Sequence, residues 1–206
     1  MARDRGSIVK MSRREGYALH PKAHKALIKR TTMPGQPAGR MSRNKPSQYS
    51  LQLREKQKVK RLYGLLEKQF SNLMREASRT HGQAGEVLLQ LLELRLDNLV
   101  YRSGLAVSRR ASRQLVTHGH FMYNGRRVDI PSIRVKVGDE IKLRDHSKQT
   151  EYFKKIDEVS PANPNDLPSW LKVDRKKFEI KVVSLPSREE AEPDINEQLI
   201  VEYYSR

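Results

Sequence analysis

The sequence LRLDNLVYRSGLAVSRRASRQLV, residues 94–116, decides the fold that we expect for this chain. Its leucines predict a short helix that ends at Ser103-Gly104, and Ser108 is a typical N-cap for a second helix over 109–117. Three arginines crowd the start of that second helix: Arg109, Arg110 and Arg113. Each cation there opposes the helix dipole at a cost of about 0.3–1 kcal/mol. The pattern therefore predicts an anion nearby, and a helix N-terminus with arginine side chains suits phosphate.

A small antiparallel sheet is predicted downstream of these two helices. Residues 120–123 alternate toward Asn124-Gly125, which is the strongest short signal for a hairpin with a type I′ turn. Alternating apolar residues over 135–143 and again over 178–183 predict further strands. The local pattern is therefore helix, helix and sheet, with two more arginines directly after the hairpin turn.

The C-terminal part of the chain is less regular. Residues 160–168 are rich in proline and asparagine and form a predicted loop, which Trp170 and Leu171 anchor to a core. After an acidic linker, Asp194 to Glu197 has the spacing of a capping box and predicts the start of a last helix.

Upstream of residue 94, the clearest helical pattern covers residues 50–79, with Ser50 as a plausible N-cap. Its apolar face is Val59, Leu62, Tyr63, Leu66, Phe70, Leu73, Met74 and Ala77, and its opposite face carries Arg54, Arg61, Lys68, Arg75 and Arg79. Such a basic face is usually only solvated, but no acid of this helix shares the line, which slightly favours phosphate contact. The glycines near residue 83 break the helix. The apolar stripe of the helical sequence that follows changes face near Glu93, which predicts two short helices with a bend between them.

The net charge of +17 favours a polyanionic partner, with nucleic acid first and an anionic membrane surface second. The whole basic excess lies in residues 1–144, while residues 145–206 carry a net charge of −3. A membrane surface is the weaker alternative because the most basic segment, residues 1–45 with a net charge of +10, has little apolar face to insert. Within that segment only residues 23–29 predict a short helix. The basic segment as a whole is either a solvated arm or an arm that becomes ordered on RNA, and its charge favours the second interpretation.

Several classes of chemistry find no support in the sequence. The chain has no cysteine, which excludes disulfides and thiolate metal sites, and no signal peptide or membrane-spanning run is visible. No nucleotide-binding or hydrolase motif occurs. His20 and His24 do not complete a zinc shell. These absences argue against an enzyme.

Three further features bear on RNA binding. His118 and His120 suit RNA contact, and two solvated loop histidines are an equally good interpretation. Asp97 is expected to form an ion pair with an arginine of the next helix, because Arg95 and Arg102 lack the helical spacing that would bring them to it. The aromatic content of 6% offers few platforms for stacking bases, so structured RNA, read by shape and phosphate position, is the favoured partner.

At several places the sequence resembles the family of bacterial small-subunit ribosomal protein four. The matching runs are YSLQLREKQKVKRLYGLLEKQF at 49–70, RLDNLVYR at 95–102, ASRQLV at 111–116, NGR at 124–126 and NEQLIVEYYSR at 196–206. RREG at 13–16 and PGQ at 34–36 also fit. The resemblance covers essentially the whole chain.

The resemblance implies an α+β fold: a helical domain with an inserted S-four RNA-binding module, in which two helices pack on a small antiparallel sheet, plus a basic N-terminal arm. The expected boundaries are 1–46 for the arm, 47–93 with 190–206 for the helical domain, and 94–189 for the module with its extension. Relatives often hold zinc with cysteines, where this chain has Val9 and Ser12, so no zinc and no other cofactor is expected.

For function, the resemblance implies a structural constituent of the small ribosomal subunit. Such a protein binds small-subunit ribosomal RNA, nucleates subunit assembly and lies where messenger RNA enters, beside small-subunit proteins three and five, with an influence on translational accuracy. It is a cytoplasmic ribosomal protein, a plastid ribosome being less favoured, and neither membrane-bound nor a stable homo-oligomer. Some members repress their own messenger.

The residues expected to contact RNA are Arg3, Arg13, Arg14, Arg40, Arg43, Tyr49, Arg54, Lys56, Lys58, Arg61, Lys68, Arg95, Asn98, Arg102, Ser108, Arg109, Arg110, Arg113, Gln114, His118, Asn124, Arg126 and Arg127. Two alternatives share such a module. An RNA-modifying enzyme would need a catalytic domain, for which residues 145–206 are too short and irregular. An RNA chaperone of the heat-shock type would lack the matching helical ends.

Overall fold

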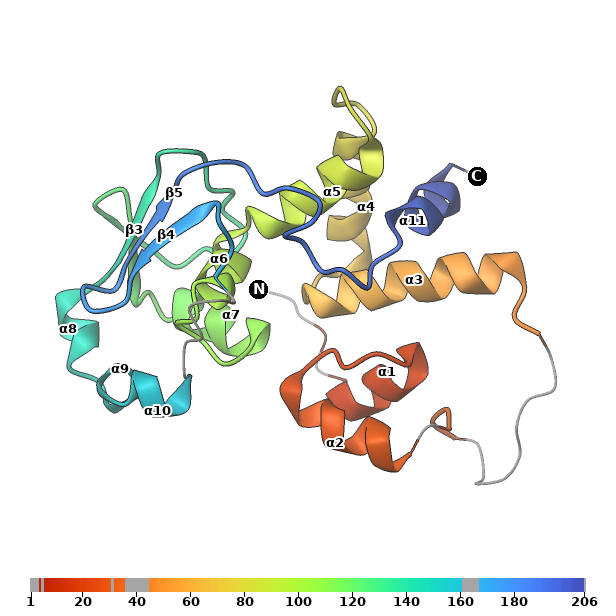
Figure 1. Cartoon of the computed structure of the whole chain (residues 1–206), viewed down its shortest axis with the longest axis horizontal. Helices are drawn as coiled ribbons and strands as arrows, with labels where there is room; N and C mark the ends of the chain where they lie inside the picture. Colours follow the sequence, from red (N-terminus) through yellow and green to blue (C-terminus); the bar gives the residue numbers. More distant parts are fainter. Residues whose placement is uncertain (1–3, 5, 31, 36–44, 161–166, 206) are drawn as a thin grey trace. The chain divides into compact units, whose positions relative to one another are not determined.

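The computed structural model describes residues 4, 6–30, 32–35, 45–160 and 167–205. They fold into two compact units, one of Met1–Leu88 with Asp194–Arg206 and the other of Leu89–Pro193. The chain leaves the first unit within a helix and returns to it just before the last helix (Figure 1). The first unit is therefore built from both ends of the chain. The mixture of helices and antiparallel strands confirms the predicted α+β class.

The first unit is helical over its described residues. Its helices are α1 (Ile8–Glu15), α2 (Pro21–Lys29), α3 (Gln48–Leu62), α4 (Glu67–Ala77), the first half of α5 (Ala84–Glu93) and α11 (Glu197–Tyr204). The C-terminal α11 packs along α3, and α1 packs against both α2 and α3 (Figure 1). Helix α3 is thus the element that the two ends of the chain share.

The single helix predicted over residues 50–79 is wrong, because the structure has two helices there, α3 and α4. Gly64 lies between them with φ of 66°, a left-handed conformation that favours glycine and ends a helix. The apolar spacing nevertheless identified the inner face correctly, since the side chains of Val59, Phe70 and Met74 are buried.

The N-terminal residues contain more structure than the sequence predicts. Only a helix near residues 23–29 is expected, whereas the structure also forms α1 and packs it against α3. The fully buried carboxylate of Glu15 accepts hydrogen bonds from Arg54, at 3.1 Å, and from Arg61. Periodicity missed α1 because this helix is short and mostly polar, and its burial rests on Met11 and on an ion pair distant in sequence.

A buried lysine ties α11 to α3 and α4. The ammonium of Lys56 lies 2.6 Å from a carboxylate oxygen of Glu67 and 4.5 Å from the ring centroid of Tyr203. The Tyr204 hydroxyl donates to the same oxygen at 3.0 Å, and Lys60 donates to the other oxygen at 2.8 Å. An ion pair and a cation–π contact therefore reinforce the apolar packing between the two ends of the chain.

The first unit should lose stability in acid because of Glu67. Burial acts to raise the pKa of Glu67, but hydrogen bonds from Lys56, Lys60 and Tyr204 outweigh it and lower that pKa to about 2. Folding thus favours the carboxylate, whose contribution is complete above the ordinary pKa of 4.5 and is lost as pH falls through about 2. Hydrogen-exchange protection of the α11 amides measures this loss. We expect Glu67→Gln to remove most of the pH dependence, and an unchanged acid response would contradict this role.

Two helix starts differ from the prediction by two or three residues. The N-cap of α3 is Ser47, whose hydroxyl accepts the backbone N–H of Ser50, so Ser50 is not the cap. The N-cap of α11 is Asn196, whose side-chain oxygen accepts the backbone N–H of Leu199, and not Asp194. In both cases a second capping residue stands close by, and spacing alone could not choose between them.

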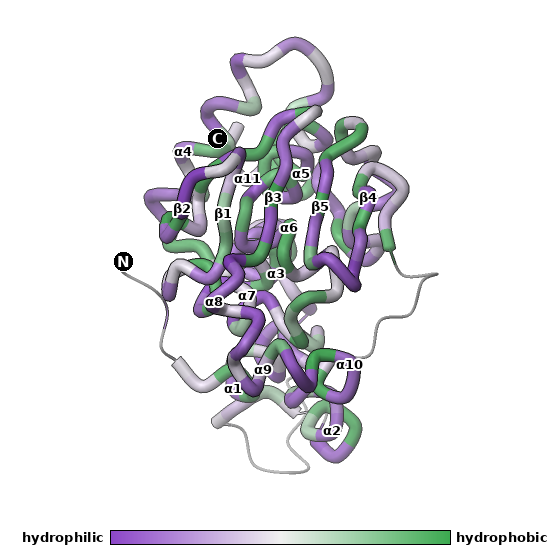
Figure 2. Tube along the Cα trace, turned by 90° about the vertical axis from the view of Figure 1, so that its left-hand side faces the viewer, coloured by the Kyte–Doolittle hydropathy of each residue, from purple (hydrophilic) through white to green (hydrophobic). Residues whose placement is uncertain are grey.

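The second unit is a five-stranded antiparallel sheet with α6 and α7 on one face. Its strands are β1 (Phe121–Tyr123), β2 (Arg126–Val128), β3 (Glu140–Leu143), β4 (Leu171–Asp174) and β5 (Glu179–Val182). They lie side by side in the order β2-β1-β3-β5-β4 (Figure 2). The helices are α6 (Leu96–Arg102), α7 (Arg109–Thr117), α8 (Asp145–Lys148), α9 (Glu151–Lys154) and α10 (Ile156–Val159).

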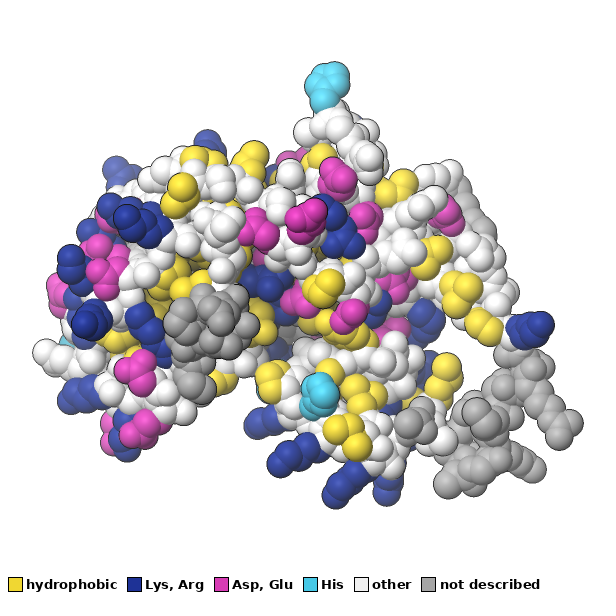
Figure 3. Space-filling model, viewed as in Figure 1, with side chains coloured by type: hydrophobic (Ala, Val, Ile, Leu, Met, Phe, Trp, Pro, Cys, Tyr) yellow, Lys and Arg dark blue, Asp and Glu magenta, His cyan; other side chains and the backbone are white. Residues whose placement is uncertain are grey.

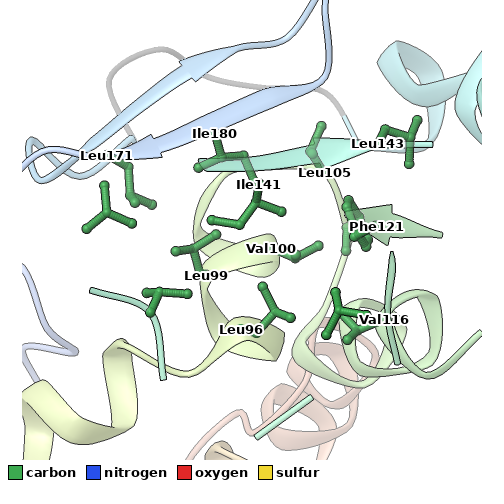
Figure 4. Close-up of a cluster of buried hydrophobic side chains, with 14 of the residues drawn as sticks. Leu96, Leu99, Val100, Leu105, Val116, Phe121, Ile141, Leu143, Leu171 and Ile180 are labelled. Carbon is green, nitrogen blue, oxygen red and sulfur yellow. The ribbon is translucent and has the colours of Figure 1, made fainter. Parts of the chain in front are cut away.

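The core of the second unit lies between α6, α7 and the inner face of the sheet. Fully buried side chains from helices and strands converge there (Figure 4), among them Leu96, Leu99, Val116, Phe121, Ile141 and Ile180. Burying a side chain of this size stabilises the fold by about 1.5–3 kcal/mol. Trp170 and Leu171 belong to the same core, as predicted, while most of the predicted loop before them, residues 161–166, lies outside the described residues.

The elements quoted first from the sequence are the best predicted. Helix α7 begins and ends where expected, and the Ser108 hydroxyl accepts the backbone N–H of Ala111. Asn124 and Gly125 both have positive φ, 47° and 81°, as a type I′ turn requires. In contrast, residues 135–137 form no strand, and the sequence did not predict β4 or the short helices α8, α9 and α10.

Candidate nucleic-acid interface

The arginines of residues 94–116 divide into an inner and an outer set. The inner set and its partners, called here the inner ion-pair network, are Arg95, Arg102, Arg109, Arg113, Glu93, Asp97 and Glu192. All of them belong to the second unit. Asn98 connects them, because its side chain bonds Glu93 and Arg109 and its backbone N–H donates to Asp97.

Asp97 is the centre of one half of this network. Its carboxylate accepts two hydrogen bonds from Arg95, at 3.0 and 2.7 Å, and one from Arg113 of α7, at 3.2 Å. The contact with Arg113 confirms the predicted ion pair with the next helix. The exclusion of Arg95 is wrong, because Arg95 is the N-cap of α6 with ψ of 139°, an extended conformation to which helical spacing does not apply.

Glu93 is the centre of the other half. Arg102 donates to both of its carboxylate oxygens, each at 2.9 Å, and the Asn98 amide donates to one of them at 2.8 Å. Glu93 and Asn98 are 1% and 2% exposed, so these groups cannot meet RNA without unfolding. Their polar side chains join the last residue of α5 to α6.

Arg109 joins the network from the first turn of α7. It donates to the Asn98 side-chain oxygen at 2.8 Å and to Glu192 at 2.6 Å, and its guanidinium lies 4.5 Å from the ring centroid of Tyr101. Glu192 is far away in sequence, which is why local spacing did not reveal it. The anion that the crowded arginines require is therefore supplied largely by the protein's own carboxylates.

The outer set remains available to a partner. The α7–hairpin surface, as we call it, consists of Arg110, Gln114 and His118 on the outer face of α7, together with Arg126 and Arg127 of β2. All five residues are exposed. The three on α7 are spaced by four residues and so lie on one side of the helix. No ion pair among the described residues occupies the three arginines, which leaves their charge for an external anion.

Gly119 leaves room for the Arg127 side chain, and this contact predicts the effect of replacing Gly119 with alanine. Its φ is 71°, and a Cβ there would lie 2.7 Å from Nε of Arg127. Gly119→Ala should cost about 1–2 kcal/mol of stability, because alanine resists the left-handed conformation, and should displace the Arg127 side chain. Urea unfolding followed by Trp170 fluorescence measures the first effect, and the affinity for RNA measures the second. A variant equal to wild type in both would contradict this packing.

The hairpin tip is fixed by hydrogen bonds to Asp139 and Glu140, which lie at the start of β3. The Asp139 carboxylate accepts from the Tyr123 hydroxyl at 2.5 Å and from the Asn124 amide at 2.8 Å, and the Asn124 oxygen accepts from the backbone N–H of Glu140. Burial, and then this bond to Asp139, raise the pKa of Tyr123 to about 12. The side chain of Asn124, predicted as an RNA contact, thus serves first to orient the turn that presents Arg126.

In the first unit, most of the predicted contacts are already engaged. Arg54 and Arg61 bind Glu15, so the basic face predicted along residues 50–79 is partly neutralised by a carboxylate from another helix. Lys56 is buried, and its ammonium is held by Glu67. Three more side chains have partners, namely Arg13 with the Thr32 carbonyl, Lys58 with Glu55 and the Asp194 carbonyl, and Tyr49 with the ring of Tyr203. Arg14 and Lys68 are exposed, and Arg3, Arg40 and Arg43 lie outside the described residues.

The structure also displays exposed basic side chains on α1 and α2, of which sequence reasoning singled out Arg14 alone. Figure 3 shows dark blue side chains gathered over α1 and α2. The exposed cations of these helices are Lys10, Arg14, Lys22, Lys25, Lys29 and Arg30. The His20-Pro21 pair was the sequence signal that could have placed the cations of α2 on a helix. Pro21 is the first residue of α2, and the His20 ring accepts the backbone N–H of Lys22.

Two other kinds of site were sought over the same residues. Among the helices that the structure describes, none is long and apolar enough to cross a membrane. Across residues 4, 6–30, 32–35, 45–160 and 167–205, no group of three or more histidine or acidic side chains is arranged to hold a metal ion.

Comparison with known proteins gives matches over both units. Residues 3–93 match the family described as ribosomal protein S4/S9 N-terminal domain, and residues 94–141 match the S4 domain. The chain is 51% identical to small ribosomal subunit protein uS4 of Herpetosiphon aurantiacus, 49% to that of Chloroflexus aurantiacus and 50% to that of Clostridioides difficile. Each match covers all of both chains.

The boundary between the two family matches falls at residue 94, where the inner ion-pair network begins. Full-length identity near one half leaves no part of the chain outside the resemblance. The chain therefore belongs to the family of small ribosomal subunit protein uS4.

Proposed function

We propose that this protein is a structural component of the small ribosomal subunit and binds the subunit's RNA directly through the α7–hairpin surface. Membership of the uS4 family carries the first part of this proposal. The exposure of Arg110, Arg126 and Arg127, beside neighbouring arginines that carboxylates neutralise, supports the second part. The protein is not an enzyme, because its family is one of structural ribosomal components.

The chemistry of the surface favours folded RNA over single strands. Arginine, glutamine and histidine side chains on a rigid helix and hairpin donate to phosphate and sugar oxygens. Most aromatic rings near this surface are packed inward, as in the contact of Phe121 with Phe153 at 6.3 Å between ring centroids. A surface with so few stacking platforms recognises RNA mainly by its shape and by the position of its phosphates.

The family resemblance supports finer proposals about place and time. We propose that the protein binds small-subunit RNA early in assembly, near the path by which messenger RNA enters, beside small-subunit proteins three and five. As part of a bacterial-type ribosome it would act in the cytoplasm. Its contact with protein five would then influence translational accuracy.

Retention by ribosomal RNA at high salt tests the proposed function. The full chain is mixed with small-subunit RNA and, separately, with large-subunit RNA, and each mixture is sedimented through a high-salt gradient. We expect the protein to travel with small-subunit RNA only. Equal retention on both RNAs, or release from both, would contradict the proposal.

A further inference from the structure

A pocket of about 310 Å³ opens beside α1 in the first unit, apart from the α7–hairpin surface. Its walls include Asp4 and Ser7 before the helix, Lys10 and Arg14 along it, and Arg61 of α3. Ser7, Lys10 and Arg14 follow the spacing of one helix face, so Lys10 and Arg14, two of the three cations of α1, lie on the side of the pocket. The volume is at the lower end of the range of ligand-binding pockets.

The charge around this pocket is positive. Arg61, which lines the pocket, shares the single carboxylate of Glu15 with Arg54, and this leaves one positive charge in excess. Lys10 and Arg14 add two more, and the carboxylate of Asp4 on the rim removes one. The net charge around the pocket is therefore +2. The side chains that carry it come from α1 and α3, and Arg61 of α3 is fixed by its ion pair with the buried carboxylate of Glu15. A site of this kind attracts anions and repels metal cations.

Backbone groups at the start of α1 add donors to the same place. Ser7 is the N-cap of this helix, but its side chain makes no capping hydrogen bond, and the first turn contains no acid. The first N–H groups of a helix have no partner within the helix, and the helix dipole favours negative charge there. Asp4 uses one nearby donor, because it accepts the backbone N–H of Gly6 at 2.8 Å.

We propose that this pocket binds one phosphate group, held by Lys10, Arg14 and Arg61 and by the backbone N–H groups at the start of α1. A phosphate carries several acceptor oxygens, which suits a guanidinium, an ammonium and backbone donors that converge from different sides. The phosphate can belong to an RNA backbone or be free in solution. The RNA source rests on the proposed function, whereas the pocket itself does not.

Amide NMR on the full chain tests the pocket with two probes. In the first arm, inorganic phosphate is titrated and the amide signals of Ser7, Ile8 and Val9 are followed. In the second arm, a small-subunit RNA fragment replaces phosphate. We expect shifts at these amides in the RNA arm, and shifts in the phosphate arm as well if the pocket accepts free phosphate.

A double variant and a matched control connect these shifts to the cations. Lys10→Gln with Arg14→Gln removes two exposed charges of the pocket. The concentration of phosphate or RNA that gives half-maximal shifts at Ser7–Val9 should then rise at least about tenfold. Lys25→Gln with Lys29→Gln removes the same charge from α2, outside the pocket, and should leave these shifts in place.

The outcomes separate the pocket from the proposed function. If the chain binds RNA but the Ser7–Val9 amides respond to neither probe, the pocket is refuted and the proposed function stands. If the chain fails to bind RNA but phosphate shifts these amides, the pocket stands and takes free phosphate. Equal loss in the double variant and in its control would also refute the pocket, because general charge would then explain the response.

Discussion

Replacing Asp97 with alanine should lower the free energy of unfolding of the second unit by about 3–5 kcal/mol, the usual effect of removing one partner from a buried ion pair. The Asp97 side chain is 6% exposed and accepts four hydrogen bonds, two from Arg95, one from Arg113 and one from the backbone N–H of Asn98. Without this carboxylate, Arg95 and Arg113 keep their charge but lose the counterion that both of them contact. Water cannot easily replace it, because Arg95 itself is only 6% exposed.

Urea unfolding followed by fluorescence measures this loss in one unit alone. Trp170 is the single tryptophan of the chain and lies fully buried in the core of the second unit. Asp145→Ala is the matched control, since Asp145 is 95% exposed and pairs with Lys148 only on the surface. It should change stability by less than about 1 kcal/mol. If Asp97→Ala is no more destabilising than this control, the inner ion-pair network does not stabilise the fold as described.

Replacing Arg110, Arg126 and Arg127 together with alanine should weaken binding to small-subunit RNA by about a hundredfold, while the fold remains intact. Each of these exposed cations is expected to contribute about 1 kcal/mol through a phosphate contact, and the three contributions should roughly add. Equilibrium binding of the full chain to a small-subunit RNA fragment measures the change. Unfolding monitored at Trp170 should be within about 0.5 kcal/mol of wild type, because none of the three side chains is buried.

A second triple variant controls for the loss of charge. Lys172, Lys176 and Lys177 lie on β4 and in the turn that follows it, and all three are exposed. Their replacement by alanine removes the same formal charge from the same unit but leaves the α7–hairpin surface unchanged. We expect this control to lose less than about fivefold in affinity, as for a general electrostatic effect. Equal losses in both triple variants would argue against a defined surface.

Local patterns predicted the local structure well. Ser108 marked the start of α7 correctly, and Asn124-Gly125 located the hairpin, because a cap and a type I′ turn depend on neighbouring residues alone. The residues of the α7–hairpin surface were also named from the sequence. Those of α7 could be found because their exposure follows from the same helical periodicity that buries Val116, and Arg126 and Arg127 because they directly follow the hairpin turn.

Long-range partners explain the other differences. The sequence shows that Arg109 and Arg113 need an anion, but Glu192 is supplied by a segment 83 residues away from Arg109. Glu15, which neutralises Arg54, likewise lies 39 residues before it. No periodicity connects such pairs, so arginines that are internal to the fold looked like arginines offered to RNA. Strand β4 was missed for a similar reason, since its place at the sheet edge depends on pairing with β5.

The salt dependence of RNA binding tests most directly the division into inner and outer arginines. The slope of the logarithm of the binding constant against the logarithm of the salt concentration counts the phosphates that the protein neutralises, at about 0.7–0.9 per contact. The triple variant at Arg110, Arg126 and Arg127 should reduce this slope by about 2 to 3. A slope equal to that of wild type would show that RNA does not contact the α7–hairpin surface.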